Sequence, residues 1–357
     1  MLNRKRIAMP VIGIFCITLL LSACGAEKDK PRTLQQTIPI YKTEEEYQAQ
    51  LGETAPLFES HPDDYIVHQW PEEQTGISRP YGICVVDDYA YVCDFDNSCI
   101  VKLDMEGNPV ASYGEQGTEE GNFSNPTAIT CHDGLLYVLD QGNYRVQIFD
   151  MEMNYQREES YKPVTFQPRD YLQDIAVDKD GIIFLSIWTN ANTYAVYYIS
   201  DERLMAVNPR ISGCLAEYQG EIYAMNTFEY STILSNGSTS LGATYMSMGA
   251  NFFLKCTPAG LEQLAELPYK YTPSDFCIVD DMIYAISLHG YERQIDRITM
   301  DGQLDSAVHV FKTSPERDWS KVTVEPTTFP FYLDVVDDDH IYAVDSLWKT
   351  IYYFEKR

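Results

Sequence analysis

Side chains able to carry acid–base chemistry are numerous in this chain, but they form no recognised catalytic pattern. The 357 residues include 53 Asp and Glu, and six histidines scattered over the sequence: His61, His68, His132, His289, His309 and His340. No G-x-S-x-G, H-E-x-x-H or P-loop pattern occurs. The carboxylates could include the pair that a glycoside hydrolase needs, but their abundance singles out no pair. We therefore assign no catalytic residue, metal ligand or cofactor.

Acidic turns offer one alternative, a calcium site. Runs of aspartate occur between apolar segments, at Asp87-Asp88, Asp280-Asp281 and Asp337-Asp338-Asp339. Aspartate is common in turns for local reasons, because its side chain hydrogen-bonds the nearby backbone. We favour the turn interpretation and keep calcium as the alternative.

Cysteine is placed as a small buried hydrophobe rather than as a metal ligand. Seven cysteines follow Cys24, an odd number that cannot pair completely: Cys84, Cys93, Cys99, Cys131, Cys214, Cys256 and Cys277. Most lie inside apolar runs, and no C-x-x-C or Cys/His spacing indicates zinc. Cys93 and Cys99 could face each other across one hairpin, but we favour free thiols.

The composition indicates a globular, strand-rich protein that does not bind nucleic acid. Hydrophobic residues make up 45% and aromatic residues 13%, with 27 tyrosines, a bias that favours strands. The formal net charge of −27 repels phosphate backbones and excludes nucleic acid as a partner.

The elements that must position any site are short strands in a six-fold repeat. A strand with a central aromatic residue recurs, and these aromatics lie at positions 91, 137, 184, 223, 284 and 342. Another apolar strand precedes each by about eight residues, and third and fourth strands follow most of them. Four short strands in about 40–50 residues are typical of a propeller blade. We predict one all-β domain, a six-bladed β-propeller over residues 65–357.

The last repeat lacks a fourth strand, and the chain supplies a candidate from its other end. The segment Tyr65 to Trp70 precedes the first repeat and belongs to no other blade. Pairing it with the last strand would close the ring and cover an exposed edge. We therefore expect residues 65–70 to complete the sixth blade.

Three segments around the second repeat carry a family resemblance. Gly114-Glu115-Gln116-Gly117, then Gly121 to Ile129, then Tyr137 to Asp150 with its Asn143-Tyr144-Arg145 step, resemble an NHL repeat. The first repeat keeps Asp94 but lacks the Asn-x-Arg, and the later repeats match only in strand pattern. The resemblance implies an NHL-like six-bladed propeller, a family mostly of binding scaffolds with a few lyases and hydrolases.

A propeller also predicts where a ligand would bind. The long connections 160–171, 227–250 and 312–330 would all emerge on one face, and long connections are often functional. Arg79 could hold a carboxylate or sulfate, and the tyrosines could stack on sugars or peptides. The alternative is that the tyrosines only pack between blades and Arg79 pairs with Asp170 or Asp275. Residues expected at the mouth of the channel on this face are Arg79, Tyr81, Asn125, Asp170, Tyr171, Ser274, Asp275, His289, Phe331 and Tyr332.

The N-terminus predicts export and a lipid anchor. Basic residues at positions 4–6 precede an apolar run from Ile7 to Leu21, which is too short to span a bilayer and is typical of a signal peptide. Leu21-Ser22-Ala23-Cys24 resembles the bacterial lipobox, which implies a diacylglycerol on Cys24 after cleavage. We predict a signal peptide over 1–23, a tether over 24–64 and attachment to the outer face of the cell membrane.

These observations favour a surface-anchored lipoprotein whose propeller binds an extracellular glycan, peptide or protein. One alternative is a propeller lyase or glycoside hydrolase that acts on an extracellular polymer. A second is a structural partner in an envelope complex.

Overall fold

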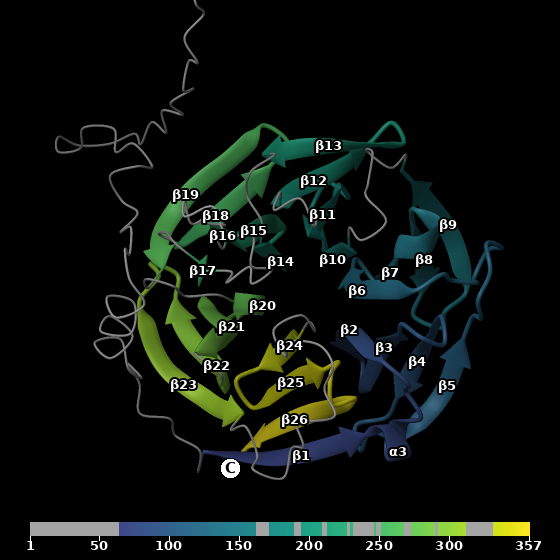
Figure 1. Cartoon of the computed structure of the whole chain (residues 1–357), viewed down its shortest axis with the longest axis horizontal. Coiled ribbons are helices and arrows are strands. Elements are labelled where there is room, and N and C mark those ends of the chain that lie inside the picture. Colours follow the sequence, from purple (N-terminus) through teal and green to yellow (C-terminus); the bar gives the residue numbers. More distant parts are fainter. Residues whose placement is uncertain are drawn as a thin grey trace, which may run out of the picture.

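The computed structural model describes residues 64–161, 171–188, 194–208, 213–226, 229–230, 246–247, 251–267, 273–289, 292–311 and 331–357. In these residues, six four-stranded antiparallel sheets are arranged as blades around a central channel (Figure 1). The all-β, six-bladed propeller predicted from the repeat is confirmed. The predicted signal peptide and all of the tether except Asp64 lie outside the described residues. None of the helices in the described part of the chain is long and apolar enough to cross a membrane.

Each blade is a meander whose first strand lies innermost. Blades 1 to 3 consist of β2 (Pro80–Val86), β3 (Tyr89–Asp94), β4 (Cys99–Leu103) and β5 (Pro109–Tyr113); β6 (Pro126–His132), β7 (Leu135–Asp140), β8 (Arg145–Asp150) and β9 (Tyr155–Ser160); and β10 (Tyr171–Val177), β11 (Ile183–Trp188), β12 (Tyr194–Ser200) and β13 (Arg203–Asn208).

Blades 4 to 6 follow the same order, except that blade 4 carries an extra small sheet and blade 6 takes its outer strand from the N-terminal part of the domain. They consist of β14 (Gly213–Tyr218), β15 (Glu221–Asn226), β18 (Asn251–Thr257) and β19 (Gly260–Leu267); β20 (Pro273–Val279), β21 (Met282–His289), β22 (Glu292–Thr299) and β23 (Leu304–Phe311); and β24 (Phe331–Asp337), β25 (His340–Asp345), β26 (Thr350–Lys356) and β1 (Tyr65–Pro71). Blade 4 also carries a two-stranded sheet of β16 (Glu229–Tyr230) and β17 (Met246–Ser247) between its second and third strands.

The ring is closed by the N-terminal strand, as expected. β1 pairs antiparallel with β26, from Tyr65 opposite Lys356 to Pro71 opposite Thr350. Trp70 is 3% exposed, and its indole ring lies between blade 6 and the turn of blade 1 that contains Gly107. The first and last parts of the domain therefore share one sheet.

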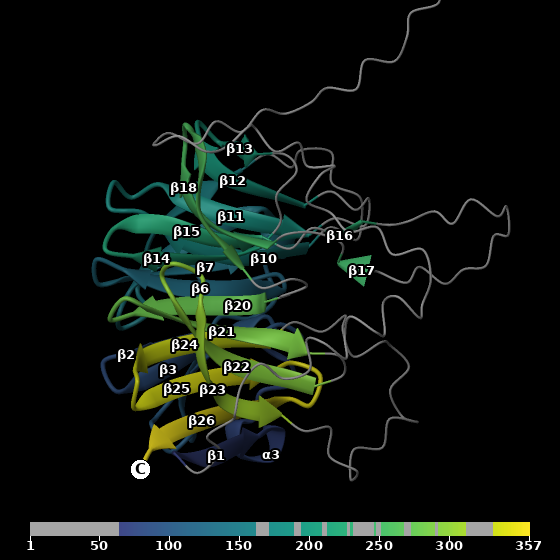
Figure 2. The same ribbon diagram turned by 90° about the vertical axis from the view of Figure 1, so that its left-hand side faces the viewer.

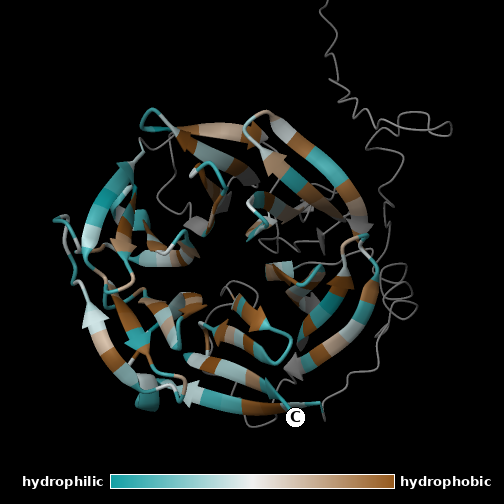
Figure 3. Cartoon of the chain, turned by 180° about the vertical axis from the view of Figure 1, so that it is seen from behind, coloured by the Kyte–Doolittle hydropathy of each residue, from teal (hydrophilic) through white to brown (hydrophobic). Residues whose placement is uncertain are grey.

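The hydrophobic core is divided into six clusters, and each lies between two neighbouring blades. The repeated aromatic of the second strand is part of this core, and Tyr91, Tyr284 and Tyr342 are almost fully buried. Hydrophobic and hydrophilic residues are interspersed along the strands (Figure 3), but the second strands β3, β7 and β25 are buried along almost their whole length because neighbouring blades cover both of their faces. The hydrophobic core of the ring therefore lies between the blades.

The acidic turns have a local structural explanation. Asp87 and Asp88 both have positive φ, at 50° and 62°, and so do Asp280 and Asp281, at 50° and 58°. Positive φ at both central residues is the type I′ geometry of a tight hairpin, which Asp and Asn adopt more readily than most residues. These aspartates therefore suit the turn that joins the first and second strands.

The two faces of the ring carry different connections. One face carries the crossovers between blades and the connections from second to third strands, including the helix α3 (Glu72–Thr75) and the 3₁₀ turn η1 (Gln141–Asn143). We call it the funnel face. β16 and β17 stand on the side of the ring that α3 occupies, and the C-terminus lies on the other side (Figure 2). The part of the 227–250 insertion that is described therefore lies on the predicted face.

Candidate functional site

Aromatic and charged side chains of blades 1 and 6 meet at the funnel end of the channel. Tyr81 stacks on Phe95, with ring centroids 4.7 Å apart and planes 20° apart. The Arg79 guanidinium lies 5.4 Å from the Phe95 centroid, and its Nε is 3.1 Å from Asp96 Oδ2. Tyr332 contacts Tyr81 with centroids 5.6 Å apart. We call these five residues the mouth cluster.

The buried carboxylate of Asp94 fixes the two segments that carry this cluster. Asp94 ends β3 and accepts hydrogen bonds from the backbone N–H groups of Ser78 and Arg79, at 2.9 and 3.1 Å. It also accepts the side-chain amide of Asn97 at 2.8 Å. The Phe95 N–H donates to the Arg79 carbonyl at 3.0 Å. The blade crossover and the β3–β4 connection are thereby held together.

Asn125 supports the cluster from the next crossover. Its Nδ2 donates to the Phe95 carbonyl at 3.0 Å, and its N–H donates to Ser98 Oγ at 3.2 Å. Its φ of +53° is one that asparagine tolerates. The Asn125 amide therefore helps to position the mouth cluster by holding the Phe95 backbone.

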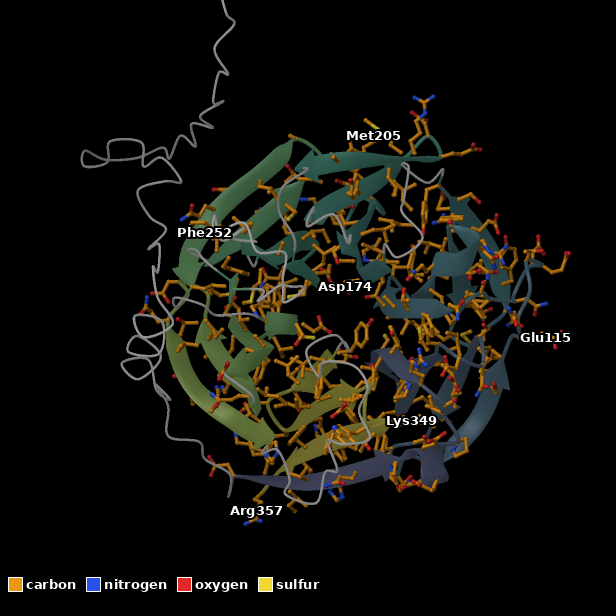
Figure 4. The ribbon with its side chains drawn as sticks, in the orientation of Figure 1. Glu115, Asp174, Met205, Phe252, Lys349 and Arg357 are labelled. Carbon is orange, nitrogen blue, oxygen red and sulfur yellow. The ribbon has the colours of Figure 1, made fainter. Side chains whose placement is uncertain are left out.

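The channel below the mouth is acidic. A cavity of about 170 Å³ is lined by all six inner strands, β2, β6, β10, β14, β20 and β24. Its lining includes Asp174, Asp275, Asp334 and Glu217, and none of the described lining residues is basic. Figure 4 shows Asp174 at the inner edge of the ring, beside the central opening.

Three of these carboxylates connect neighbouring blades. Asp174 Oδ1 accepts its own strand's Ile175 N–H at 2.8 Å, and Oδ2 accepts the Leu215 N–H of blade 4 at 2.7 Å. Asp275 accepts the Phe276 N–H at 2.9 Å and the Leu333 N–H of blade 6 at 2.8 Å.

Asp334 repeats the arrangement between blades 6 and 1. It accepts the N–H groups of Val335 at 2.9 Å and Val85 at 2.5 Å. We call Asp174, Asp275 and Asp334 the channel carboxylates.

The channel carboxylates hold protons more tightly than exposed aspartates. Burial raises the pKa of all three carboxyls, to about 6 for Asp334, and the charge of Asp174 further raises the pKa of Asp275. Their backbone hydrogen bonds oppose the rise but do not cancel it.

The structure places the predicted site residues at different depths. Arg79, Tyr81 and Tyr332 come together, and Asp275 lies deeper in the channel, where it accepts backbone N–H groups. The alternative that Arg79 pairs with Asp275 is wrong, because Arg79 pairs with Asp96. For Tyr171 and His289 only the backbone is described, at the funnel ends of β10 and β21, and Asp170 lies outside the described residues.

Four residues of the site were not predicted from the sequence: Phe95, Asp96, Asp174 and Asp334. The available signal for the last two was an acidic residue inside an otherwise apolar inner strand, at position 174 and again at 275 and 334.

The Asn-x-Arg step of blade 2 is structural. Arg145 Nε binds Asp140 Oδ2 at 2.8 Å, and both side chains are nearly fully buried. Asn143 Nδ2 donates to the same Asp140 oxygen at 2.9 Å, while the Ser124 N–H donates to Asp140 Oδ1 at 2.7 Å. The motif therefore fastens the crossover that precedes blade 2 to the start of its third strand.

The described cysteines form no disulfide. Cys93 lies opposite Ile100 and Cys99 lies opposite Asp94, so the two thiols point to opposite faces of the sheet. They belong to different hydrophobic clusters, and all seven cysteines are free. The thiols of Cys93 and Cys99 are therefore free, as favoured from the sequence, and the alternative of a disulfide between them is wrong. Within the described residues, no group of three or more His, Cys, Asp or Glu side chains could hold a metal ion.

Comparison with known proteins identifies the fold but no family. No family model matches the sequence. Among solved structures, the chain is similar to a PQQ-bound aldose sugar dehydrogenase from Streptomyces coelicolor, with 11% identity, a TM-score of 0.51 and coverage of 83% of this chain and 99% of that one.

Two further structures are comparably similar. A luciferin-regenerating enzyme has 11% identity and a TM-score of 0.51, covering 82% of this chain and 95% of that one. A protein from Bacteroides fragilis described as exported has 9% identity and a TM-score of 0.50, covering 84% of this chain and 97% of that one. At these identities the likeness shows the propeller fold alone.

Proposed function

We propose that this chain is a lipid-anchored, extracytoplasmic binding protein that takes an extracellular glycan or peptide at the mouth cluster. The observation that carries the proposal is the stack of Tyr81 on Phe95, with Arg79 held over Phe95 by Asp96. Aromatic faces that are already fixed suit a sugar ring or a peptide side chain, because little conformational entropy is lost when they bind.

The terminal nitrogens of Arg79 give this site a polar anchor. In the described part of the chain, Arg79 makes its ion pair through Nε, and neither terminal nitrogen has a hydrogen-bond partner. Two parallel N–H groups of a guanidinium bind a carboxylate or sulfate in a bidentate manner, and they also bind hydroxyl and carbonyl oxygens. The site therefore combines a stacking surface with one directed donor group.

A hydrolase or lyase in the same funnel is the competing function. Asp174 and Asp275 interact strongly enough to affect each other's protonation, as a catalytic carboxylate pair would. However, each of their four oxygens accepts a backbone N–H, two of them from the next blade. This arrangement favours a structural role for the pair and a binding role for the mouth.

The point where the chain enters the domain supports the anchored arrangement. Tyr65 begins β1 beside Lys356, and its hydroxyl donates to the Asp338 carbonyl in the β24–β25 turn at 2.9 Å. This turn lies on the face opposite the funnel. A tether that leads from Cys24 to Tyr65 would thus attach the ring by its far face and leave the mouth directed away from the membrane.

The proposal is tested by binding and fractionation of the full-length chain. Glycan and peptide arrays, combined with a turnover assay on each hit, identify the ligand and report any catalysis. Tyr81→Ala should then reduce affinity at least tenfold, about 1.4 kcal/mol, because it removes the stacking surface. Tyr89→Ala is the matched control, since Tyr89 begins β3 on the opposite face.

Each part of the proposal can fail separately. If Tyr81→Ala binds as tightly as wild type, the mouth cluster is not the site. If a hit is turned over, the enzyme alternative replaces the binding role. If wild type and Cys24→Ala both stay in the membrane fraction, the anchor is not at Cys24.

A further inference from the structure

The inner strands leave backbone groups that the sheets do not satisfy. In each blade the first strand is an edge strand, so one side of its ladder faces the channel without a partner strand. The three channel carboxylates accept N–H groups on this edge, each taking one from its own strand and one from the next blade. They therefore act as clamps between blades 3 and 4, 5 and 6, and 6 and 1.

The clamp at Asp275 also supports the mouth. Its Oδ2 holds the N–H of Leu333, and Leu333 directly follows Tyr332 of the mouth cluster in β24. Leu333 is 4% exposed and Tyr332 is 6% exposed, so this part of β24 is buried beside the channel cavity. A change at Asp275 therefore reaches the strand that carries Tyr332.

The groups that face these carboxylates are acidic or neutral. Those facing Asp275 come from its own strand and from three neighbouring inner strands: Asp174 on β10, Cys214 on β14, Cys277 on β20, and Tyr332 and Asp334 on β24. Asp174 faces the same thiols and Tyr332, together with Asp275.

The surroundings of Asp334 are similar. It faces thiols and one phenol: Cys84 on β2, Cys131 on β6, Cys277 on β20 and Tyr342 on β25. Glu217 of β14 also lines the cavity. No lysine, arginine or histidine is among the described residues that line it, so no cationic side chain from this part of the structure balances the charge of the ionised carboxylates.

We propose that the channel carboxylates are a proton-binding site that regulates the stability of the closed ring. Each carboxylate takes up one proton from solvent as the medium becomes mildly acidic. Protonation removes the repulsion among the three groups and the cost of burying their charge, and it weakens one of the two backbone N–H bonds that each carboxylate accepts. Because burial raises the pKa of all three carboxyls despite these hydrogen bonds, the first two effects outweigh the third. These three groups therefore contribute more to the stability of the ring at mildly acidic pH than at neutral pH.

The direction of the pKa changes determines whether stability rises or falls with pH. A carboxyl whose pKa is higher in the folded chain binds protons on folding, so its stabilisation is complete below the unfolded pKa and is lost as pH rises through the folded value. For Asp334 this window runs from 3.8 to about 6. His309 has the opposite effect, because burial lowers its pKa to about 4 and stability is lost as pH falls. The test therefore compares variants rather than wild type alone.

The experiment measures the free energy of unfolding of the full-length chain between about pH 5 and about pH 8. Wild-type folding should take up about one proton more than folding of Asp275→Asn near the lower end of this range. Asp150→Asn is the matched control. Asp150 is half-buried and lies outside the channel, and hydrogen bonds from Asn154 lower its pKa, so any loss of stability from its protonation falls below this range.

A second measurement tests the proposal on the wild type, so that it can still be decided if Asp275→Asn does not fold. Infrared spectroscopy of the folded wild type near pH 6, where exposed carboxyls are almost fully ionised, should show the carbonyl band of a protonated carboxyl, and Asp334→Asn should weaken it. The proposal is overturned if this band is absent from wild type at that pH. It is also overturned if Asp275→Asn folds and its stability depends on pH as that of wild type does.

Discussion

Truncating Trp70 tests whether the N-terminal strand holds the ring closed. Trp70 is 3% exposed, and its ring centroid lies 5.9 Å from those of both Tyr342 and Tyr353. A Cβ on Gly107 would lie 2.3 Å from the indole Cγ, so the indole ring rests directly on that backbone. Replacing a buried tryptophan by alanine costs about 3–5 kcal/mol, because transfer free energy is lost and a cavity remains. We expect Trp70→Ala to lower the free energy of unfolding by that amount.

The assay is urea unfolding of the purified full-length chain, followed by tryptophan fluorescence and by circular dichroism. Gln69→Ala is the control, because Gln69 is the exposed neighbour on the same strand and its loss should change stability by less than about 0.5 kcal/mol. If β1 closes the ring, both probes should report one transition at a lower midpoint. A Trp70→Ala midpoint equal to that of Gln69→Ala would refute the closure argument. A separate early transition with the remaining domain intact would show that β1 is an appendage.

Two further predictions concern contacts between and within blades. Gly82→Ala should destabilise the domain by about 1–3 kcal/mol in the same assay, because its Cβ would lie 2.7 Å from the Ala128 Cα of blade 2, and an unchanged midpoint would contradict this close approach. Arg145→Met should cost about 3–5 kcal/mol by leaving the buried Asp140 carboxylate without its cation. The control Arg157→Met removes an exposed pair with Glu159 and should cost less than about 1 kcal/mol, so equal losses would show that burial does not decide the effect.

The strand pattern and the turns were readable from the sequence because they depend on neighbours in the chain. Short apolar runs, the repeated aromatic and the Asp-Asp or Asp-Gly steps each act over a few residues, and they predicted six blades with strands near their observed bounds. Closure by residues 65–70 was also predictable, because the last repeat lacked a fourth strand and the strand at 65–70 belonged to no other repeat. The position of Tyr81 beside Tyr332 followed from the same map.

The partners of charged and sulfur-containing side chains were decided by the tertiary structure. Asp174, Asp275 and Asp334 lie up to 160 residues apart, and only closure of the ring brings their three strands around one cavity. Arg79 pairs with Asp96, which the β3–β4 connection presents, and the register of β3 against β4 sends Cys93 and Cys99 to opposite faces. The sequence alone determined the blades, their number and their order, because these follow from short apolar runs and turn chemistry. Which side chains share a cavity depends on register, on the angle between blades and on burial, and these exist only once the ring is closed.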